Sequence, residues 1–145
     1  MMKLKLNQEF VAIDFFDNTR LFGIMASIKS YTFCWRINAE LGMKFTFQKD
    51  NEIELERKKR KYFFKIYQWD EPNGSLKHYI YHNHYDGEYL LPEFRNMDFL
   101  WLMKGDIVDE EKCKIITNAI KSINVVQLVT ELPIEQIKNK KNMII

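Results

Sequence analysis

The sequence predicts an α+β fold, with an antiparallel or mixed sheet of five to six strands and two main helices packed on one face. Two segments carry apolar residues at helical spacing, and segments rich in aromatic and β-branched residues recur around them. No stretch rich in glycine, serine or proline divides the 145 residues. We therefore expect one α+β domain over residues 1–145, in which 134–145 is a Lys/Asn-rich C-terminal tail.

The N-terminal part predicts a short strand, a turn and then a second strand. Leu4, Leu6 and the segment Phe10–Phe16 supply strand-forming residues, whereas residues 17–18 are Asp-Asn, a pair typical of turns. The second strand covers Leu21–Met25.

The first helix has a recognisable start and end. Ser30 is a residue type that caps helix N-termini, and Gly42 is placed to end the helix in the left-handed conformation. The apolar positions between them follow helical spacing at Phe33, Cys34, Ile37 and Leu41.

The middle of the chain predicts strands. Ile53 and Leu55 alternate with glutamates, a pattern typical of a strand with one wet face. Residues 62–69 and 76–85 are predicted to pair as a hairpin through the turn at 71–75. Beyond it, Tyr89 to Leu91 could extend or re-enter the sheet until Pro92, which cannot donate to a ladder.

The last third predicts a strand, a helix and a strand. Residues 99–104 are a nearly continuous apolar strand, followed by a turn at Gly105-Asp106. Acidic residues at 109–111 favour the start of a helix. Its buried stripe is formed by Ile115, Ile116, Ala119, Ile120 and Ile123. The segment 125–132 is the closing strand, which Pro133 ends.

Composition limits the function classes. A formal net charge of +2 gives little reason to expect a polyanionic partner, and any nucleic-acid case depends on local patches. Cys34 and Cys113 lie among apolar residues and are expected to be reduced. The start of the chain lacks a secretory h-region, and the longest apolar stretch, 99–103, is too short to span a bilayer. We expect a cytoplasmic protein without membrane contact.

Three histidines in one predicted strand raise the possibility of a metal site. His78, His82 and His84 have even numbers, so their side chains point to the same face. A His-x-His pair could bind zinc with an oxygen ligand from Asp86, Glu88 or Glu93. The simpler interpretation is a solvated sheet face, because no further spaced ligand motif is present. We assign no metal ligands.

The densest charge run is Arg57-Lys58-Lys59-Arg60-Lys61, which falls where a hairpin tip would project into water. Aromatic residues that could stack on RNA bases flank it, namely Tyr62, Phe64, Tyr67, Trp69, Tyr79 and Tyr81. The competing interpretation is structural, because nearby glutamates balance the charge and no RNA-recognition motif is present. Nucleic-acid binding is therefore possible but not favoured.

Catalytic and cofactor signatures are missing from the sequence. Its serines, Ser27, Ser30, Ser75 and Ser122, lack a nucleophile-elbow frame, and neither cysteine has a nearby histidine. None of the 5 glycines forms a phosphate-binding loop. We predict no catalytic residue and no cofactor, so an enzyme is not the favoured class.

The segment Leu91–Phe99 has the chemistry of a defined connector. Pro92 suits the first position of a helical turn, and Glu93 would then lie beside exposed N–H groups. Asp98 can accept a hydrogen bond from the loop before the next strand. A capped connector explains every residue type in the segment.

The same segment resembles the signature of the bacterial IPExxxVDY family. Pro92, Glu93 and Asp98 match, while Leu91 replaces isoleucine, Met97 replaces valine and Phe99 replaces tyrosine. The resemblance implies a family without an assigned activity, and it marks Pro92, Glu93, Asp98 and Phe99 as possible binding residues.

Together, these observations favour a non-enzymatic interaction or accessory protein. The alternatives are RNA binding through Arg57–Lys61 and a metal-dependent enzyme that uses His82 and His84. The partner and the oligomeric state are not indicated by the sequence.

Overall fold

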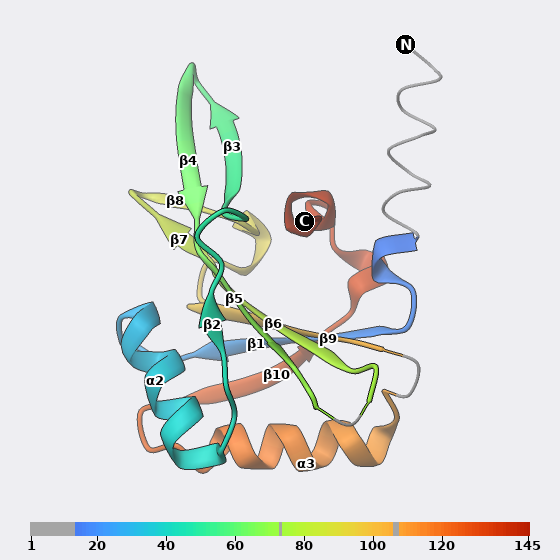
Figure 1. Cartoon of the computed structure of the whole chain (residues 1–145). Helices are drawn as coiled ribbons and strands as arrows, with labels where there is room; N and C mark the ends of the chain where they lie inside the picture. The colour runs from blue at the N-terminus through green and yellow to red at the C-terminus, as the bar shows by residue number, and fades with distance from the viewer. Residues whose placement is uncertain (1–13, 73, 106–107) are drawn as a thin grey trace.

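The computed structural model describes residues 14–72, 74–105 and 108–145. Its centre is a six-stranded antiparallel sheet, with two helices on one side and two-stranded ribbons on the other (Figure 1). The α+β prediction is confirmed. Predictions that fall on residues 1–13, on Asn73 or on Asp106 lie outside the described residues.

The sheet has the strand order β10-β1-β9-β6-β5-β2, and every neighbouring pair is antiparallel. The strands are β1 (Thr19–Met25), β2 (Thr46–Phe47), β5 (Ile66–Asp70), β6 (Lys77–His82), β9 (Phe99–Lys104) and β10 (Leu128–Leu132). Strand β9 lies between β1 and β6, and residues 99–103 are all buried. Its unbroken apolar sequence fits this position, because both of its faces are covered.

Both predicted helices form, and both pack on the same face of the sheet. Helix α2 (Ser30–Leu41) ends at Gly42, which has φ 68°. Helix α3 (Glu110–Lys121) begins after Asp109, whose carboxylate accepts a hydrogen bond from the Lys112 amide at 2.8 Å. The prediction that Ile115 belongs to the buried stripe of α3 is wrong, because its side chain is exposed. The prediction that Ser30 caps α2 is wrong. Ser30 is the first helical residue, and its buried hydroxyl bonds the Tyr67 hydroxyl instead.

The hydrophobic core on this side, which we call the helix-face core, is continuous from α2 to α3. Phe33 stacks on Phe99 with ring centroids 4.3 Å apart. The other buried members include Phe22, Ile24, Ile37, Phe45, Ile80, Trp101, Met103, Cys113, Ile116, Ile120 and Ile123.

The central strand predictions need two corrections. The predicted strand at 62–69 is two strands, β4 (Arg60–Phe64) and β5, which are separated at Lys65. Strand β4 pairs with β3 (Ile53–Arg57) outside the main sheet, so the chain changes partner at this break. Likewise, the predicted strand at 76–85 is interrupted at Asn83.

After Asn83 the chain forms a second small ribbon. Strands β7 (His84–Tyr85) and β8 (Glu88–Tyr89) pair with each other and do not join the main sheet. Asp86 and Gly87 turn the chain with φ of 48° and 86°. At the N-terminal end, residues 14–16 form a helical turn rather than the predicted strand, closed by a bond from the Asp17 amide to the Asp14 carbonyl.

The second face of the sheet carries a second core, which we call the ribbon-face core. It includes Leu21, Ile53, Phe64, Ile66, Tyr81, Leu90, Leu91, Met97, Leu100, Leu102, Ile137 and Met143. The covering elements are the β3–β4 ribbon and the short 3₁₀ helices η1 (Pro92–Phe94), η2 (Ile134–Gln136) and η3 (Lys140–Met143).

The Lys/Asn-rich segment 134–145 folds onto this face. Met143 is fully buried, and its carbonyl accepts a hydrogen bond from the buried Tyr81 hydroxyl at 2.8 Å. Among the described residues, no helix has the length and apolarity needed to cross a membrane.

Candidate functional site

The segment Leu91–Phe99 is a connector wrapped around one side chain, that of Asn83. The Asn83 amide nitrogen donates to the carbonyls of Phe94 and Met97, both at 2.9 Å. Its side-chain oxygen accepts from the Leu91 amide at 2.8 Å. Asn83 is fully buried, so these bonds satisfy backbone groups that water does not reach.

The backbone of Asn83 extends this network. Its amide donates to the Asp98 carbonyl at 3.0 Å, and its carbonyl accepts from the Leu90 amide at 3.0 Å. A single asparagine therefore holds both ends of the connector. This role of Asn83 was not predicted, because nothing in the sequence near residue 83 indicates that its side chain binds the connector.

The charged residues of the signature bind backbone at separate places. Pro92 is the first residue of η1, as predicted. Asp98 accepts a hydrogen bond from the Ala26 amide at 2.8 Å, which ties the connector to the loop before α2. Glu93 accepts from the amide and the side chain of Asn139, both at 3.0 Å, and so anchors the C-terminal segment. These hydrogen bonds hold the pKa of Glu93 below its usual value despite the opposing effect of burial.

The apolar residues of the signature are packed into the two cores. Phe99 lies in the helix-face core, and Met97 lies in the ribbon-face core against Gly23. A Cβ atom at Gly23 would come within 2.9 Å of the Met97 side chain, so glycine is needed there for this packing. Each of Pro92, Glu93, Asp98 and Phe99 thus has a structural role.

His78 is enclosed in the helix-face core, so the interpretation of the histidine face as solvated is wrong there. The Trp101 indole N–H donates to His78 Nδ1 at 3.0 Å. Because an indole can only donate, Nδ1 carries no proton, and Nε2–H donates to the Glu71 carboxylate at 2.8 Å. Burial lowers the pKa of His78. Lys112 of α3 also donates to Glu71 at 3.0 Å, which ties the helix to the β5–β6 hairpin.

His82 and His84 do come near each other, with ring centroids 6.4 Å apart. His82 stacks on Phe99, and burial lowers its pKa to about 4. His84 accepts a hydrogen bond from the Gly87 amide at 3.2 Å. Over residues 14–72, 74–105 and 108–145, no three histidine, cysteine, aspartate or glutamate side chains gather as a metal would require. The predicted carboxylate partner is not brought to this pair.

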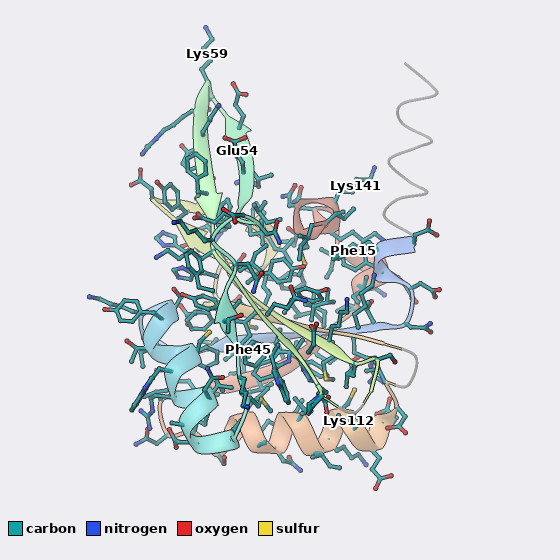
Figure 2. The ribbon with its side chains drawn as sticks, viewed as in Figure 1. Phe15, Phe45, Glu54, Lys59, Lys112 and Lys141 are labelled. Atoms are coloured by element: carbon teal, nitrogen blue, oxygen red, sulfur yellow. The ribbon has the colours of Figure 1, made fainter. Side chains whose placement is uncertain are left out.

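The basic run lies at the tip of the β3–β4 ribbon, which projects from the body of the protein with Lys59 at its outer end (Figure 2). Three of its five side chains form ion pairs. Arg57 contacts Glu88 at 3.0 Å, Arg60 contacts Asp86, and Lys61 contacts Glu54 at 3.6 Å. The first two of these pairs tie the β3–β4 ribbon to the β7–β8 ribbon.

The remaining two lysines, Lys58 and Lys59, form the turn itself. Both are exposed, and their φ angles are 53° and 62°. Left-handed backbone costs about 1 kcal/mol for each residue that has a Cβ, and asparagine or glycine usually fills such turns.

The six aromatic residues that were predicted to flank the basic run are mostly unavailable for base stacking, although Phe63 of β4 and Tyr85 of β7 are exposed. Five of the six are buried, and Trp69 is partly buried. The five are Tyr62, Phe64, Tyr67, Tyr79 and Tyr81. Their role is therefore packing within the two cores.

The two cysteines are free and buried, Cys34 in α2 and Cys113 in α3. Burial raises the pKa of both thiols, which disfavours the nucleophilic thiolate.

The two most exposed aromatic residues of the described chain lie on α2. Trp35 is 68% exposed and Tyr31 is 59% exposed, although both are in a helix that packs on the core. Phe47 of β2 is also exposed. We call Tyr31, Trp35 and Phe47 the aromatic surface.

Contacts of neighbouring residues place this flank of α2 on the same side as Phe47. Helical spacing puts Tyr31, Trp35 and Asn38 along one flank of α2, and Asn38 bonds the backbone of Phe45 just before β2. This flank therefore faces β2. At the other end, the Tyr67 hydroxyl bonds Ser30, next to Tyr31, while the Tyr67 ring lies 5.4 Å from the ring of Phe47.

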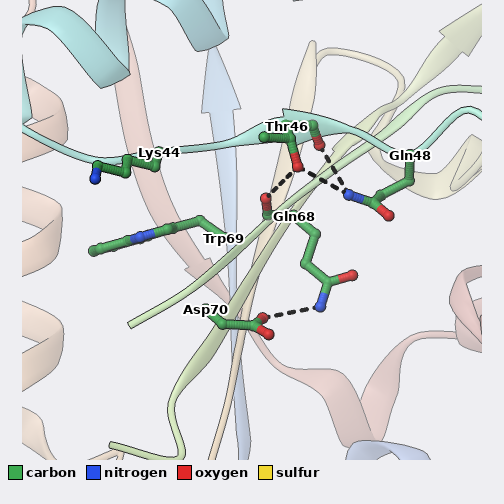
Figure 3. Close-up of a pocket in the computed structure, with 6 residues that line it drawn as sticks. All are labelled: Lys44, Thr46, Gln48, Gln68, Trp69 and Asp70. Carbon is green, nitrogen blue, oxygen red and sulfur yellow. Dashed lines mark hydrogen bonds between the residues drawn. The ribbon is translucent and has the colours of Figure 1, made fainter. Parts of the chain in front are cut away.

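A shallow polar pocket of about 280 Å³ lies beside β2, on the face of the sheet opposite to the aromatic surface (Figure 3). It is lined by Lys44, Thr46, Gln48, Gln68, Trp69 and Asp70. The Gln48 amide donates to the Thr46 hydroxyl at 3.1 Å, and the Gln68 amide donates to Asp70 at 2.9 Å.

Comparison with protein-family models and with curated proteins finds no match to this chain.

Proposed function

We propose that this protein is a non-enzymatic interaction domain of the cytoplasm that binds a protein partner through the aromatic surface. The observation that carries the proposal is the exposure of Trp35 and Tyr31, 68% and 59%, one turn apart on α2. Tryptophan and tyrosine contribute the largest binding energies at protein interfaces, because they bury much apolar area with few rotatable bonds.

A structural role does not account for these two side chains. The face of α2 that packs on the sheet is formed by Ser30, Phe33, Cys34 and Ile37. Within the part of the chain that the structure describes, the polar contact of the Tyr31 ring is a cation–π contact, in which the Lys29 ammonium lies 5.8 Å from the ring centroid. An interaction role explains why large aromatic groups are kept in water at these positions.

Native co-purification with mass spectrometry, followed by binding measurements on the purified partner, tests the proposal. We expect Trp35→Ala to weaken binding at least about tenfold, as for an interface hot spot. Ile115→Ala is the matched control, because Ile115 is an exposed apolar residue on α3, 58% exposed, outside the aromatic surface. Equal loss of binding in the two variants, or no loss in Trp35→Ala, would refute the proposal.

RNA binding through Arg57–Lys61 is the second candidate, and the strained turn at Lys58 and Lys59 favours it. Backbone strain of this kind concentrates at functional sites. The affinity for single-stranded RNA should then fall steeply with added salt. Replacement of the five residues by serine should abolish it, and unchanged binding would reject this site.

A metal-dependent enzyme that uses His82 and His84 is the weakest candidate, because no carboxylate in the described residues completes a ligand set with the pair. Stoichiometric zinc in protein purified without an affinity tag would revive it. The likeness of Leu91–Phe99 to the IPExxxVDY signature supports a proposal that the chain belongs to that bacterial family.

A further inference from the structure

Strand β2 is the outer strand at one end of the sheet, and its outward edge is partly open. The Gln48 amide donates to the Ile66 carbonyl at 2.9 Å, across the ladder with β5. Backbone hydrogen-bonding groups alternate in direction along an antiparallel strand. The N–H and C=O groups of Thr46 and Gln48 therefore point to β5, whereas those of Phe45 and Phe47 point away from the sheet.

The outward-pointing backbone groups of Phe45 and Phe47 differ in their hydrogen bonds. At Phe45, the amide donates to Asn38 Oδ1 at 2.8 Å and the carbonyl accepts from Asn38 Nδ2 at 3.0 Å. The Asn38 side chain therefore takes the place of a neighbouring strand. At Phe47, no residue in the described ranges bonds the amide or the carbonyl.

A strand added at Phe47 could contact side chains on both faces of the sheet. On the helix face lie the exposed rings of Tyr31, Trp35 and Phe47. On the opposite face lies the polar pocket, which Thr46 and Gln48 line (Figure 3). Successive residues of a strand added at Phe47 would point alternately to the rings and to the polar pocket.

Charges of both signs lie beside this edge. Lys44 and Lys49 flank β2, and Lys29 lies at the start of α2. Asp70 lines the polar pocket together with Lys44, and Asp50 follows Lys49 in the chain. The open backbone groups of Phe47 and the exposed rings therefore define what this edge can bind, rather than its charge.

From these observations we infer that β2 binds an extended peptide segment of a partner protein as an added strand, with an apolar side chain seated on the aromatic surface. This inference rests on the proposed interaction function and specifies the form of the partner. Main-chain hydrogen bonds to Phe47 supply affinity, and alternate side chains supply specificity.

A phage-displayed library of random dodecapeptides is the probe. We expect the full chain to enrich peptides that share an aromatic or aliphatic residue at one fixed position. Phe47→Pro and Phe47→Ala both lose the ring, but only proline removes the outward N–H, and it leaves the bonds to β5 intact. The proline variant should bind a selected peptide about tenfold more weakly than the alanine variant.

Amide exchange on the wild-type complex provides a measurement that does not depend on the folding of a variant. Protection of the Phe47 amide by the bound peptide is expected, and an unprotected amide would overturn the inference. A failure to enrich any peptide would also overturn it. A stable dimer formed through β2, detected by light scattering, would overturn it as well. If Trp35→Ala abolishes binding while the two Phe47 variants bind equally, the interaction function stands and strand addition fails.

Discussion

The two faces of the sheet are covered by different kinds of structure. On the helix face, α2 and α3 satisfy most of their own backbone groups and contribute apolar stripes to the core. On the ribbon face the cover is irregular, and side chains bind its backbone. Asn83 binds the connector, Glu93 binds Asn139, and Asn142 donates to the Leu90 carbonyl at 2.9 Å. The helix face is formed by helices with a regular apolar spacing, whereas the cover of the ribbon face is fixed by hydrogen bonds from a few polar side chains.

The most sensitive point of the ribbon face should be Asn83. Asn83→Ala leaves the Leu91 amide and the Met97 carbonyl without their partner, and it removes one of the two donors to the Phe94 carbonyl. We expect a loss of about 3–4 kcal/mol in the free energy of unfolding, measured by urea denaturation. Asn118→Ala, at an exposed position of α3, should change stability by less than about 0.5 kcal/mol. Similar values for both variants would contradict the difference between the faces.

The helix face should show a distinct pH dependence through His82, which stacks on Phe99. Burial, together with repulsion from His84 and Lys65, lowers the pKa of His82 to about 4 from its ordinary value of 6.5. The unfolded chain therefore binds a proton first as the pH falls. The stabilising contribution is complete above pH 6.5 and is lost as the pH falls toward about 4.

His82→Gln tests this directly, because it removes the titrating group. Between pH 7 and pH 4, the variant should lose less stability than the wild type, by about 2 kcal/mol after allowance for partial exposure. Chemical denaturation at both pH values measures the difference. Parallel pH profiles for the two proteins would show that His82 does not couple folding to protons.

The signature carboxylates give smaller effects, which separate structure from binding. Asp98→Asn weakens a charge-assisted bond to the Ala26 amide and should cost about 1 kcal/mol. Glu93→Gln, which changes an exposed hydrogen bond to Asn139, should lower the free energy of unfolding by less, about 0.5 kcal/mol. Thermal unfolding measures both. Unchanged stability combined with loss of a co-purifying partner would instead make these residues a binding site.

A change in the turn of the β3–β4 ribbon should instead raise the free energy of unfolding. Replacement of Lys58 by asparagine and Lys59 by glycine provides residues that accept the left-handed turn. Stability should increase by about 1 kcal/mol, which thermal unfolding would detect. A decrease would mean that the lysine side chains contribute to the ribbon beyond their backbone conformation.

The helix face was the more predictable of the two. The stop at Gly42, the start at Asp109 and the apolar strand of residues 99–104 each depend on local chemistry, which a sequence displays. The ribbon face was less predictable, because its determinants are non-local. The break at Lys65 reflects a change of strand partner, and the hub at Asn83 depends on carbonyls 11 and 14 residues away.

The candidate site follows the same division. A sequence displays the basic run of residues 57–61, but it does not display that acidic residues of another ribbon neutralise Arg57 and Arg60. Trp35 lies among the apolar positions of α2, and only the packing of the helix shows that its ring remains in water.

The Asn38 side chain also bears on how the protein stays dispersed. An exposed strand edge invites identical chains to stack without limit, the route by which sheets grow into fibrils. By occupying the amide and carbonyl of Phe45, Asn38 shortens the available edge to a single residue pair. One short peptide fits such an edge, whereas a growing polymer does not. Asn38→Ala would therefore lengthen the template and make the chain prone to aggregate.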